Sequence, residues 1–131
     1  MDNLGLGRRL LVGLVVLTAA GLLATVNPRS AEAATGAGYC AGRKVRTLPF
    51  SAGSVWVFKG NGYVCAVTFA KKAGAARPMA VSVQARGSRP GVDKGRYRHH
   101  AGPVTVHAGH RCVRVRGSVG KASADSGWIL C

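Results

Sequence analysis

Four histidines lie close together in the sequence and are the first residues whose chemistry could define a site: His99, His100, His107 and His110. Neutral imidazole binds zinc, copper and nickel well. If the chain reverses at Gly102-Pro103, His99 lies across from His107, where two imidazoles could share a metal ion. However, neither a carboxylate nor a free thiol stands nearby to complete the site, and the surrounding arginines repel a cation. We therefore expect solvated histidines, no metal site and no cofactor, with a two-histidine site as the less favoured alternative.

Residues that could support catalysis are few. Beyond residue 33 the acidic side chains are Asp93 and Asp125, both in glycine-rich stretches where a carboxylate commonly bonds its own backbone in a turn. None of the serines stands in a nucleophile-elbow sequence. A Ser-His-Asp arrangement assembled in space, with His107 or His110 near Asp125, is the enzymatic alternative, and only geometry would reveal it. We expect a protein that is not an enzyme and has no catalytic residues.

The cysteines predict a disulfide framework. There are four of them, an even number in a small exported chain: Cys40, Cys65, Cys112 and Cys131. Three connectivities are possible, and we favour the sequential one, because Cys40 with Cys65 and Cys112 with Cys131 each close a loop of modest length. No two cysteines have the close spacing of a zinc site. Two disulfides would also leave no free cysteine thiolate to act as a catalytic nucleophile.

The excess of basic residues is the feature that most clearly calls for a partner. From residue 34 onward, 16 basic and two acidic residues leave a net charge of +14. Six cations fall on two segments that we expect to be neighbouring strands with one continuous positive face: Lys94, Arg96, Arg98, Arg111, Arg114 and Arg116. Such a potential attracts polyanions, which for an exported protein are phosphate-rich wall polymers, anionic lipid headgroups or released nucleic acid. Specific nucleic-acid recognition is not expected, because exposed aromatic residues among the cations are few and no binding signature is present.

The first 33 residues have the pattern of a cleavable signal peptide. Arg8 and Arg9 precede an almost wholly apolar stretch over 10–26, and Ala31-Glu32-Ala33 offers a small-residue cleavage site. A retained membrane anchor is the alternative, but the apolar stretch is at the short limit for crossing a bilayer. Residues 34–131 are enough for a single domain. We therefore expect a secreted, monomeric protein with no membrane span after cleavage.

The element that organises this domain is a predicted hairpin over 54–70. Asn61-Gly62 between alternating apolar residues favours a type I′ turn, because both residues tolerate a positive φ. That turn would place Phe58 opposite Cys65 and Trp56 opposite Val67. We expect the face that carries these side chains and Phe69 to meet the core, and the face with Val55 and Val57 to meet solvent or a lighter packing layer.

The rest of the chain predicts further short strands. Residues 43–48, 79–86, 96–101, 104–107, 113–116 and 127–131 alternate or are apolar, whereas 71–77, 87–95 and 117–127 resemble loops. The sum is an all-β fold, a small antiparallel β-sandwich of seven or eight short strands, with an open β-barrel as the alternative. The predicted core consists of Trp56, Phe58, Val67, Phe69, Val81, Val83, Val104, Val106, Val113 and Val115.

Several short motifs also resemble a known family. Tyr39-Cys40, the Cys65 strand, Ala101-Gly102-Pro103-Val104, Cys112-Val113 and the segment Trp128 to Cys131 are similar to those of the small secreted actinobacterial (streptomycete) proteins of the spore-associated protein A type. The resemblance spans nearly the whole chain after the leader. It implies an exported protein found with spores or the cell envelope, and it brings no catalytic residues.

Together these observations predict a secreted, non-catalytic, strongly basic spore- or envelope-associated protein that adheres to anionic cell-wall or spore-surface polymers. The alternative is a secreted effector, either a cationic antimicrobial or an inhibitor of an exported enzyme. An inhibitor needs a rigid protruding loop, and residues 87–95 are the candidate.

Overall fold

The computed structural model describes residues 38–131, of which Tyr39–Cys131 forms one compact unit. The predicted signal peptide over 1–33 lies outside the described residues. The unit contains eight β strands, which are β2 (Arg43–Phe50), β3 (Gly53–Gly60), β4 (Tyr63–Ala70), β5 (Arg77–Ala85), β6 (Gly91–Tyr97), β7 (His100–His107), β8 (Val113–Val119) and β9 (Ala122–Ile129).

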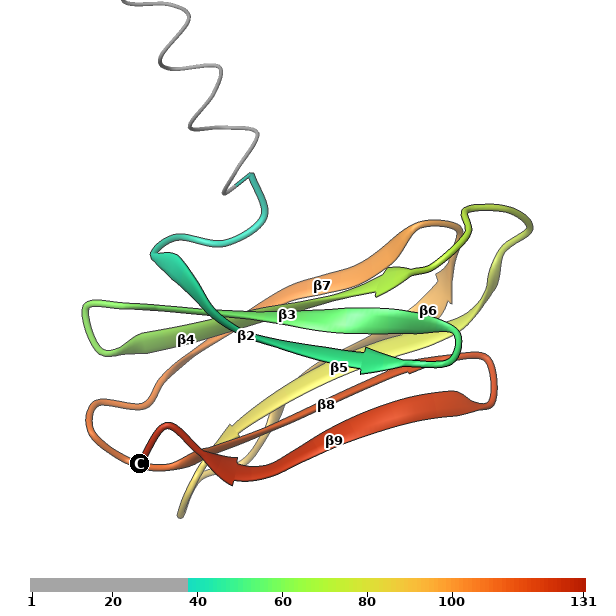
Figure 1. The fold of residues 1–131 in the computed structure, drawn as a ribbon. Coiled ribbons are helices and arrows are strands. Elements are labelled where there is room, and N and C mark those ends of the chain that lie inside the picture. The colour runs from blue at the N-terminus through green and yellow to red at the C-terminus, as the bar shows by residue number, and fades with distance from the viewer. Residues whose placement is uncertain (1–37) are drawn as a thin grey trace, which may run out of the picture. The chain divides into compact units, whose positions relative to one another are not determined.

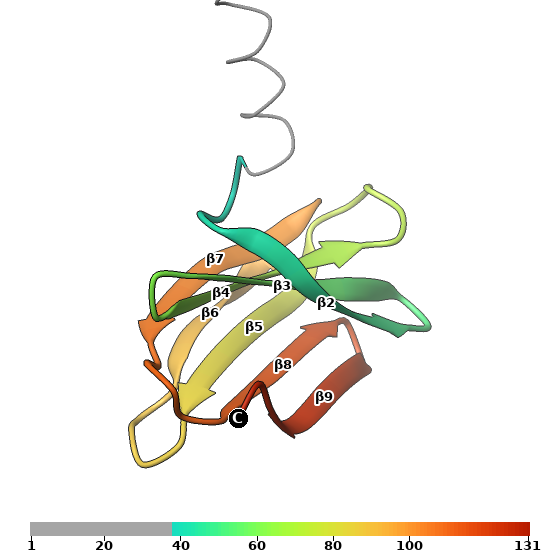
Figure 2. The same cartoon turned by 60° about the vertical axis from the view of Figure 1, so that its left-hand side comes forward.

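The strands form two four-stranded antiparallel sheets. One has the order β2-β3-β4-β7 and the other β6-β5-β8-β9. The sheets stack face to face, as Figures 1 and 2 show from two sides. The predicted all-β sandwich is therefore confirmed, and the sheets do not close into a barrel.

The central hairpin has the predicted register. Asn61 and Gly62 form the turn between β3 and β4 with φ angles of 52° and 81°. Phe58 pairs with Cys65 and Trp56 pairs with Val67. The positive φ values explain why this dipeptide fits here, since both residues tolerate the left-handed region.

The face of this hairpin that meets the main core is the opposite of the predicted one. Val55, Val57, Val64 and Ala66 are buried between the sheets, together with the predicted core residues Val81, Val83, Val104, Val113 and Val115, and Val106 packs against them partly buried. The predicted core residues Trp56, Phe58, Val67 and Phe69 instead form a second cluster, with Cys40 and Cys65, on the outer face of the first sheet. Phe58 and Val67 are buried there, while Trp56 and Phe69 are only partly covered.

Several predicted boundaries are also wrong. Gly102-Pro103 was expected to be a turn, but it lies inside β7, where the register against β4 shifts and the peptide bond is cis. The expected loop over 87–95 ends early, because β6 begins at Gly91. The expected connection over 117–127 contains the end of β8 and most of β9. In each case glycine lies within a strand rather than between strands.

Both disulfides have the predicted connectivity. Cys40 bonds Cys65, 25 residues away, and Cys112 bonds Cys131, 19 residues away. By the chain-entropy estimate each closed loop contributes about 3 kcal/mol to stability. The first bridge ties the chain before β2 to β4, and the second ties the last residue to the start of β8.

Candidate anion-binding face

The outer face of the β6-β5-β8-β9 sheet is polar and follows the alternation of its strands. On β5 the buried residues Met79, Val81 and Val83 alternate with partly exposed side chains, and β8 alternates in the same way. Because neighbours along a strand point to opposite faces, the outward set is Lys94 and Arg96 from β6, Ala80, Ser82 and Gln84 from β5, Arg114, Arg116 and Ser118 from β8, and Ser123, Asp125 and Trp128 from β9. We call this set the outer polar face.

The structure places four of the six predicted anion-binding residues on this face. They are Lys94, Arg96, Arg114 and Arg116. The predicted two-strand ladder is wrong, however, because β5 lies between β6 and β8 in the sheet. The two pairs of cations are therefore separated by a strand of small and neutral side chains. At about 4.8 Å per strand, the β6 and β8 pairs flank a gap about 10 Å wide.

The other two predicted residues lie in connections between strands. Arg98 is exposed in the turn between β6 and β7. Arg111 lies before β8 and donates hydrogen bonds to the carbonyl oxygens of Ala108 (3.1 Å) and His107 (2.9 Å) and to Ser88 Oγ (2.9 Å). Arg111 therefore ties two loops together, which is a structural role that the sequence did not reveal.

Asp125 forms ion pairs with the two arginines of β8, Arg114 and Arg116. Its carboxylate accepts hydrogen bonds from Arg114 Nε at 3.0 Å and Arg114 Nη2 at 2.6 Å, and from Arg116 Nε at 3.1 Å. The hydrogen bond from Arg114 and the backbone N–H of Gly127 hold the pKa of Asp125 well below its usual range. The same hydrogen bond raises the pKa of Arg114. Asp125 stays ionised at any ordinary pH and keeps both guanidinium groups oriented.

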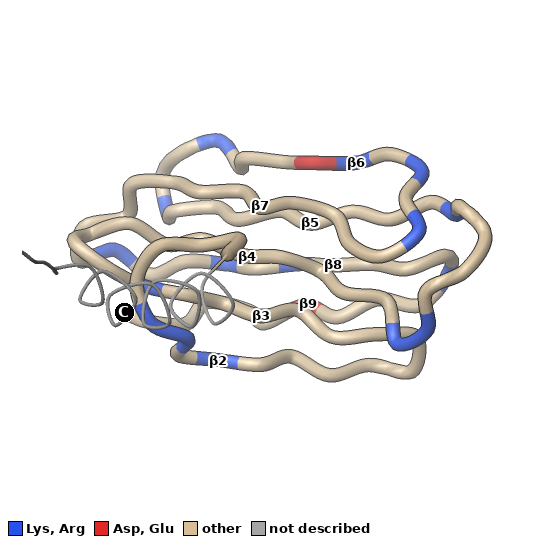
Figure 3. Tube along the Cα trace, turned by 90° about the horizontal axis from the view of Figure 1, so that it is seen from above, with Lys and Arg blue, Asp and Glu red and all other residues tan. Residues whose placement is uncertain are grey.

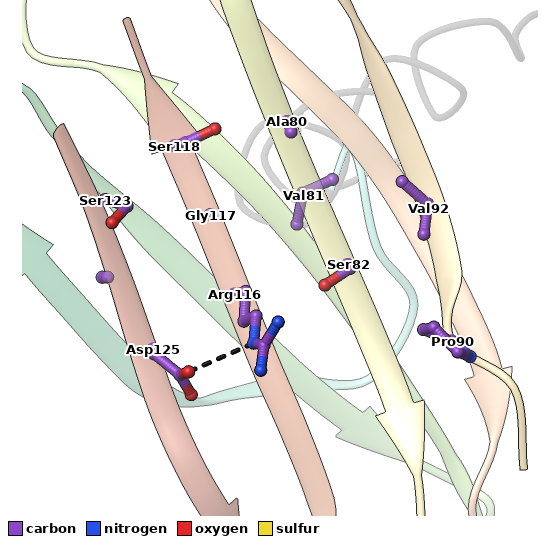
Figure 4. A pocket seen from close by; sticks show the side chains of 11 residues that line it. Ala80, Val81, Ser82, Pro90, Val92, Arg116, Gly117, Ser118, Ser123 and Asp125 are labelled. Atoms are coloured by element: carbon purple, nitrogen blue, oxygen red, sulfur yellow. Dashed lines mark hydrogen bonds and ion pairs between the residues drawn. The ribbon is translucent and has the colours of Figure 1, made fainter. Parts of the chain in front are cut away.

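A shallow hollow lies on the outer polar face, over β5 and β8. It encloses about 490 Å³. The close-up shows Arg116 between Asp125 on one side and Ser82 on the other, with Ser118 further along β8 (Figure 4). Val92 and Pro90 form its apolar wall on the β6 side. The hollow combines a cation, hydroxyl groups and a small apolar surface.

The positive charge is not restricted to this face. Basic residues also occur on β2, in the β4–β5 and β5–β6 connections and in the β8–β9 turn, so that cations surround the unit (Figure 3). The two acidic residues of the described part lie on β6 and β9 (Figure 3). Asp93, expected in a loop, accepts hydrogen bonds from Tyr97 Oη at 2.6 Å and from the Gly102 N–H at 2.7 Å. Both carboxylates are thus engaged by donors of their own chain.

The histidines do not converge. The expected approach of His99 to His107 is wrong, because His100 and His107 stand at the two ends of the single strand β7, about 23 Å apart. His100 packs against Tyr39 with ring centroids 4.6 Å apart, and His107 packs against Tyr63 at 4.9 Å. Within residues 38–131 no group of three or more histidine, cysteine or acidic side chains could hold a metal ion.

Two features of this region were missed by the sequence reasoning. Ser82 was assigned only to strand alternation and Ser118 to the expected connection over 117–127, yet both line the hollow beside Arg116. Trp128 was expected in the short strand over 127–131. The guanidinium carbon of Arg86 lies 4.8 Å from the centroid of the Trp128 ring, a contact that was not expected. The alternation of serine with valine in β5 could have indicated a hydroxyl-bearing outer face, whereas the contact with Arg86 depends on the fold.

Comparison with protein families, with curated proteins and with solved structures returns no match to this chain. Among the described residues, no helix has the length and apolar character needed to cross a membrane. What the structure defines is the class, a two-sheet β-sandwich with two disulfides and a basic surface.

Proposed function

We propose that this protein is a secreted, non-catalytic adhesion protein of the spore or cell envelope that binds anionic surface polymers through its cationic side chains. Two disulfides are compatible with an extracellular location. The resemblance to secreted spore-associated proteins supports the envelope as the place of action.

The observation that carries the proposal is the imbalance between cations and available carboxylates. Sixteen lysines and arginines occur from residue 34 onward, against Asp93 and Asp125. Asp93 is held by Tyr97 and Gly102, and Asp125 by Arg114 and Arg116. Most of the cationic side chains therefore have no internal counter-charge, and an external polyanion can supply it.

Binding of this kind consists of many weak contacts. Exposed ion pairs contribute about 0–1 kcal/mol each, so a short anion would bind poorly and a long polyanion would bind well through several contacts at once. Salt screens such contacts, because the Debye length falls from about 10 Å at 0.1 M to about 3 Å at 1 M. The proposal therefore requires strong dependence on polymer length and on ionic strength.

The test is adsorption of the purified, disulfide-bonded protein to isolated cell walls and spores over a range of sodium chloride concentrations. We expect retention at low salt and release below about 1 M. Replacing Lys94 and Arg96 together by glutamine should lower the salt concentration needed for release more than the same replacement of Arg43 and Arg46 does. Retention that does not change with salt would refute the electrostatic mechanism.

A second function is favoured by the loop between β5 and β6. This loop, residues 86–90, is shorter than expected but is well fixed: Ser88 N–H donates to Ala85 O at 2.9 Å, Gln84 Nε2 donates to Ser88 O at 3.0 Å, and Arg111 holds Ser88 Oγ. Arg89 is exposed within this loop. A rigid loop that presents an arginine is suited to a protease pocket with an acidic floor. Inhibition of a trypsin-like protease that is lost in Arg89→Ala would support this role, and its absence in the wild type would remove it.

A further inference from the structure

The hollow on the outer polar face has the chemistry of a site for one particular anion. We propose that it binds a phosphodiester group of a linear polyol-phosphate polymer, with Arg116 and the neighbouring serine hydroxyls as donors. This inference rests on the proposed function and specifies the chemical class of the polymer. The enclosed volume of about 490 Å³ is within the usual range for small-ligand sites and exceeds what one phosphate group needs.

Arg116 is oriented to present its fork of donors to the hollow. Its Nε atom donates to Asp125 Oδ2 at 3.1 Å, and the same carboxylate is also held by Arg114. Within the described residues, the two Nη groups of Arg116 make no hydrogen bond. A fixed guanidinium with two unused N–H groups matches two oxygens of a phosphate, whereas a lysine ammonium would provide only a point charge.

The serine hydroxyls lie where the remaining phosphate oxygens would be. Ser82 is the direct cross-strand partner of Arg116, and Ser118 pairs with Ser123 in the next row. Side chains that face each other in this way have Cβ atoms about 4.5–5.5 Å apart. Ser82 can therefore donate to a phosphate that Arg116 holds. Both oxygens of a carboxylate held by the Arg116 fork lie in the plane of the guanidinium group, whereas a phosphodiester is tetrahedral and also presents ester oxygens out of that plane, toward Ser82.

The other walls fit the carbon atoms and the next charge of such a polymer. Val92 is the cross-strand partner of Ser82 on β6 and provides, with Pro90, an apolar surface for the methylene groups between phosphates. Lys94 lies two residues along the same strand, about 7 Å away. It is in position to pair with the neighbouring phosphate. Together Arg116 and Lys94 would hold two consecutive phosphates across the gap formed by β5.

The experiment compares two soluble polymers with equal numbers of charges, a glycerol-phosphate oligomer and poly-L-glutamate, by titration calorimetry at one fixed salt concentration. We expect tighter binding of the phosphate oligomer. The charge-preserving variant Arg116→Lys and the variant Ser82→Ala should each lose about tenfold or more in affinity for it, as expected for the loss of one hydrogen bond to a charged group. Neither variant should change binding of poly-L-glutamate.

Arg43→Lys is the matched control, because Arg43 is exposed on β2 in the other sheet, away from the hollow, and this variant should bind both polymers like the wild type. Thermal midpoints of all variants establish that they fold. Equal affinity of the wild type for both polymers, or an Arg116→Lys variant indistinguishable from it, would overturn the phosphodiester site while leaving the salt-sensitive adhesion intact. Failure to bind either polymer at low salt would overturn both proposals. Preferential binding to phosphatidylglycerol vesicles would assign the phosphate to a lipid and overturn the polymer assignment.

Discussion

Thr68 is a buried polar residue whose replacement should stabilise the protein. Its side chain on β4 is 0% exposed, and its Oγ1 atom has no hydrogen-bond partner within the described residues. Burying a hydroxyl without a partner costs about 1–3 kcal/mol. Thr68→Val removes this hydroxyl and keeps the β-branched shape, so we expect the free energy of unfolding to rise by about 1–2 kcal/mol.

The assay is thermal and urea unfolding of the oxidised protein. For a domain of this size 1 kcal/mol corresponds to about 4–8 °C, so the midpoint should rise by about 4–16 °C. Thr105→Val on β7 is the control, because Thr105 is exposed and its replacement should change stability by no more than about 0.5 kcal/mol. A Thr68→Val midpoint equal to or below the wild type would show that the hydroxyl is satisfied and would refute the reasoning.

The same site explains why Gly117 is a glycine. A Cβ atom at this position on β8 would overlap Thr68 Oγ1 and Val55 Cγ2 across the two sheets. Gly117→Ala should therefore destabilise the protein by about 1–3 kcal/mol or more, as overpacking does. In the Thr68→Ala background one of the two overlaps disappears, so the cost of Gly117→Ala should fall by about 0.5–3 kcal/mol. Additive effects of the two replacements would contradict the predicted contact between them.

Three further predictions concern the charged network and the disulfides. The pKa of Asp125 is lowered in the folded state, so its contribution to the free energy of unfolding is present above the unfolded pKa of about 3.9 and is lost as the pH falls below that value. Because the Asp125 side chain is 40% exposed, Asp125→Asn should remove only about 0.2–1 kcal/mol at neutral pH and flatten the acid side of the plot of stability against pH. An unchanged plot would contradict this prediction. Tyr97→Phe removes one of the two donors to Asp93 and should lower the urea midpoint, whereas a neutral result would mean that water replaces the hydroxyl. Cys112→Ser together with Cys131→Ser should lower stability by about 2–5 kcal/mol, measured by urea midpoint against the wild type, and an unchanged midpoint would mean that this bridge adds no stability.

Local patterns predicted the elements of this fold well. The Asn61-Gly62 turn and the pairing of Trp56 with Val67 follow from turn chemistry and the period of two, which act over a few residues. The alternation in β5 likewise identified Val81 and Val83 as core residues. The sequential disulfides were predicted because short loops are easier to close.

The orientation of the hairpin could not be predicted in the same way, because both of its faces are apolar. The aromatic face of Trp56, Phe58 and Phe69 has the larger area and therefore indicated the core. However, the sheets meet where small and β-branched side chains allow a close approach, as the contact of Gly117 with Thr68 and Val55 requires. The large rings occupy the outer side, where Cys40 packs against them.

The arrangement of the cations was not predictable from sequence either, because it depends on strand order. The segments with Arg96 and Arg114 were expected to be neighbours, but β5, which comes earlier in the chain, lies between them. Strand pairing over such distances leaves no local pattern. The glycines in β6 and β9 also concealed those strands, since glycine weakens a strand pattern without preventing its pairing.

The two outer faces of the sandwich differ in a way that bears on where a ligand can bind. On the first sheet, the bridge from Cys40 to Cys65 holds Cys40 against Phe58 and Val67, both of which are buried. On the second sheet, the bridge from Cys112 to Cys131 lies at the ends of the strands and leaves the middle of the face uncovered. The middle of this face carries Ser82 and Arg116. Asp125 fixes the orientation of Arg116 before a ligand binds. Because an oriented donor loses less conformational entropy on binding than a mobile one, the second sheet is the face on which general attraction to anions can become selective.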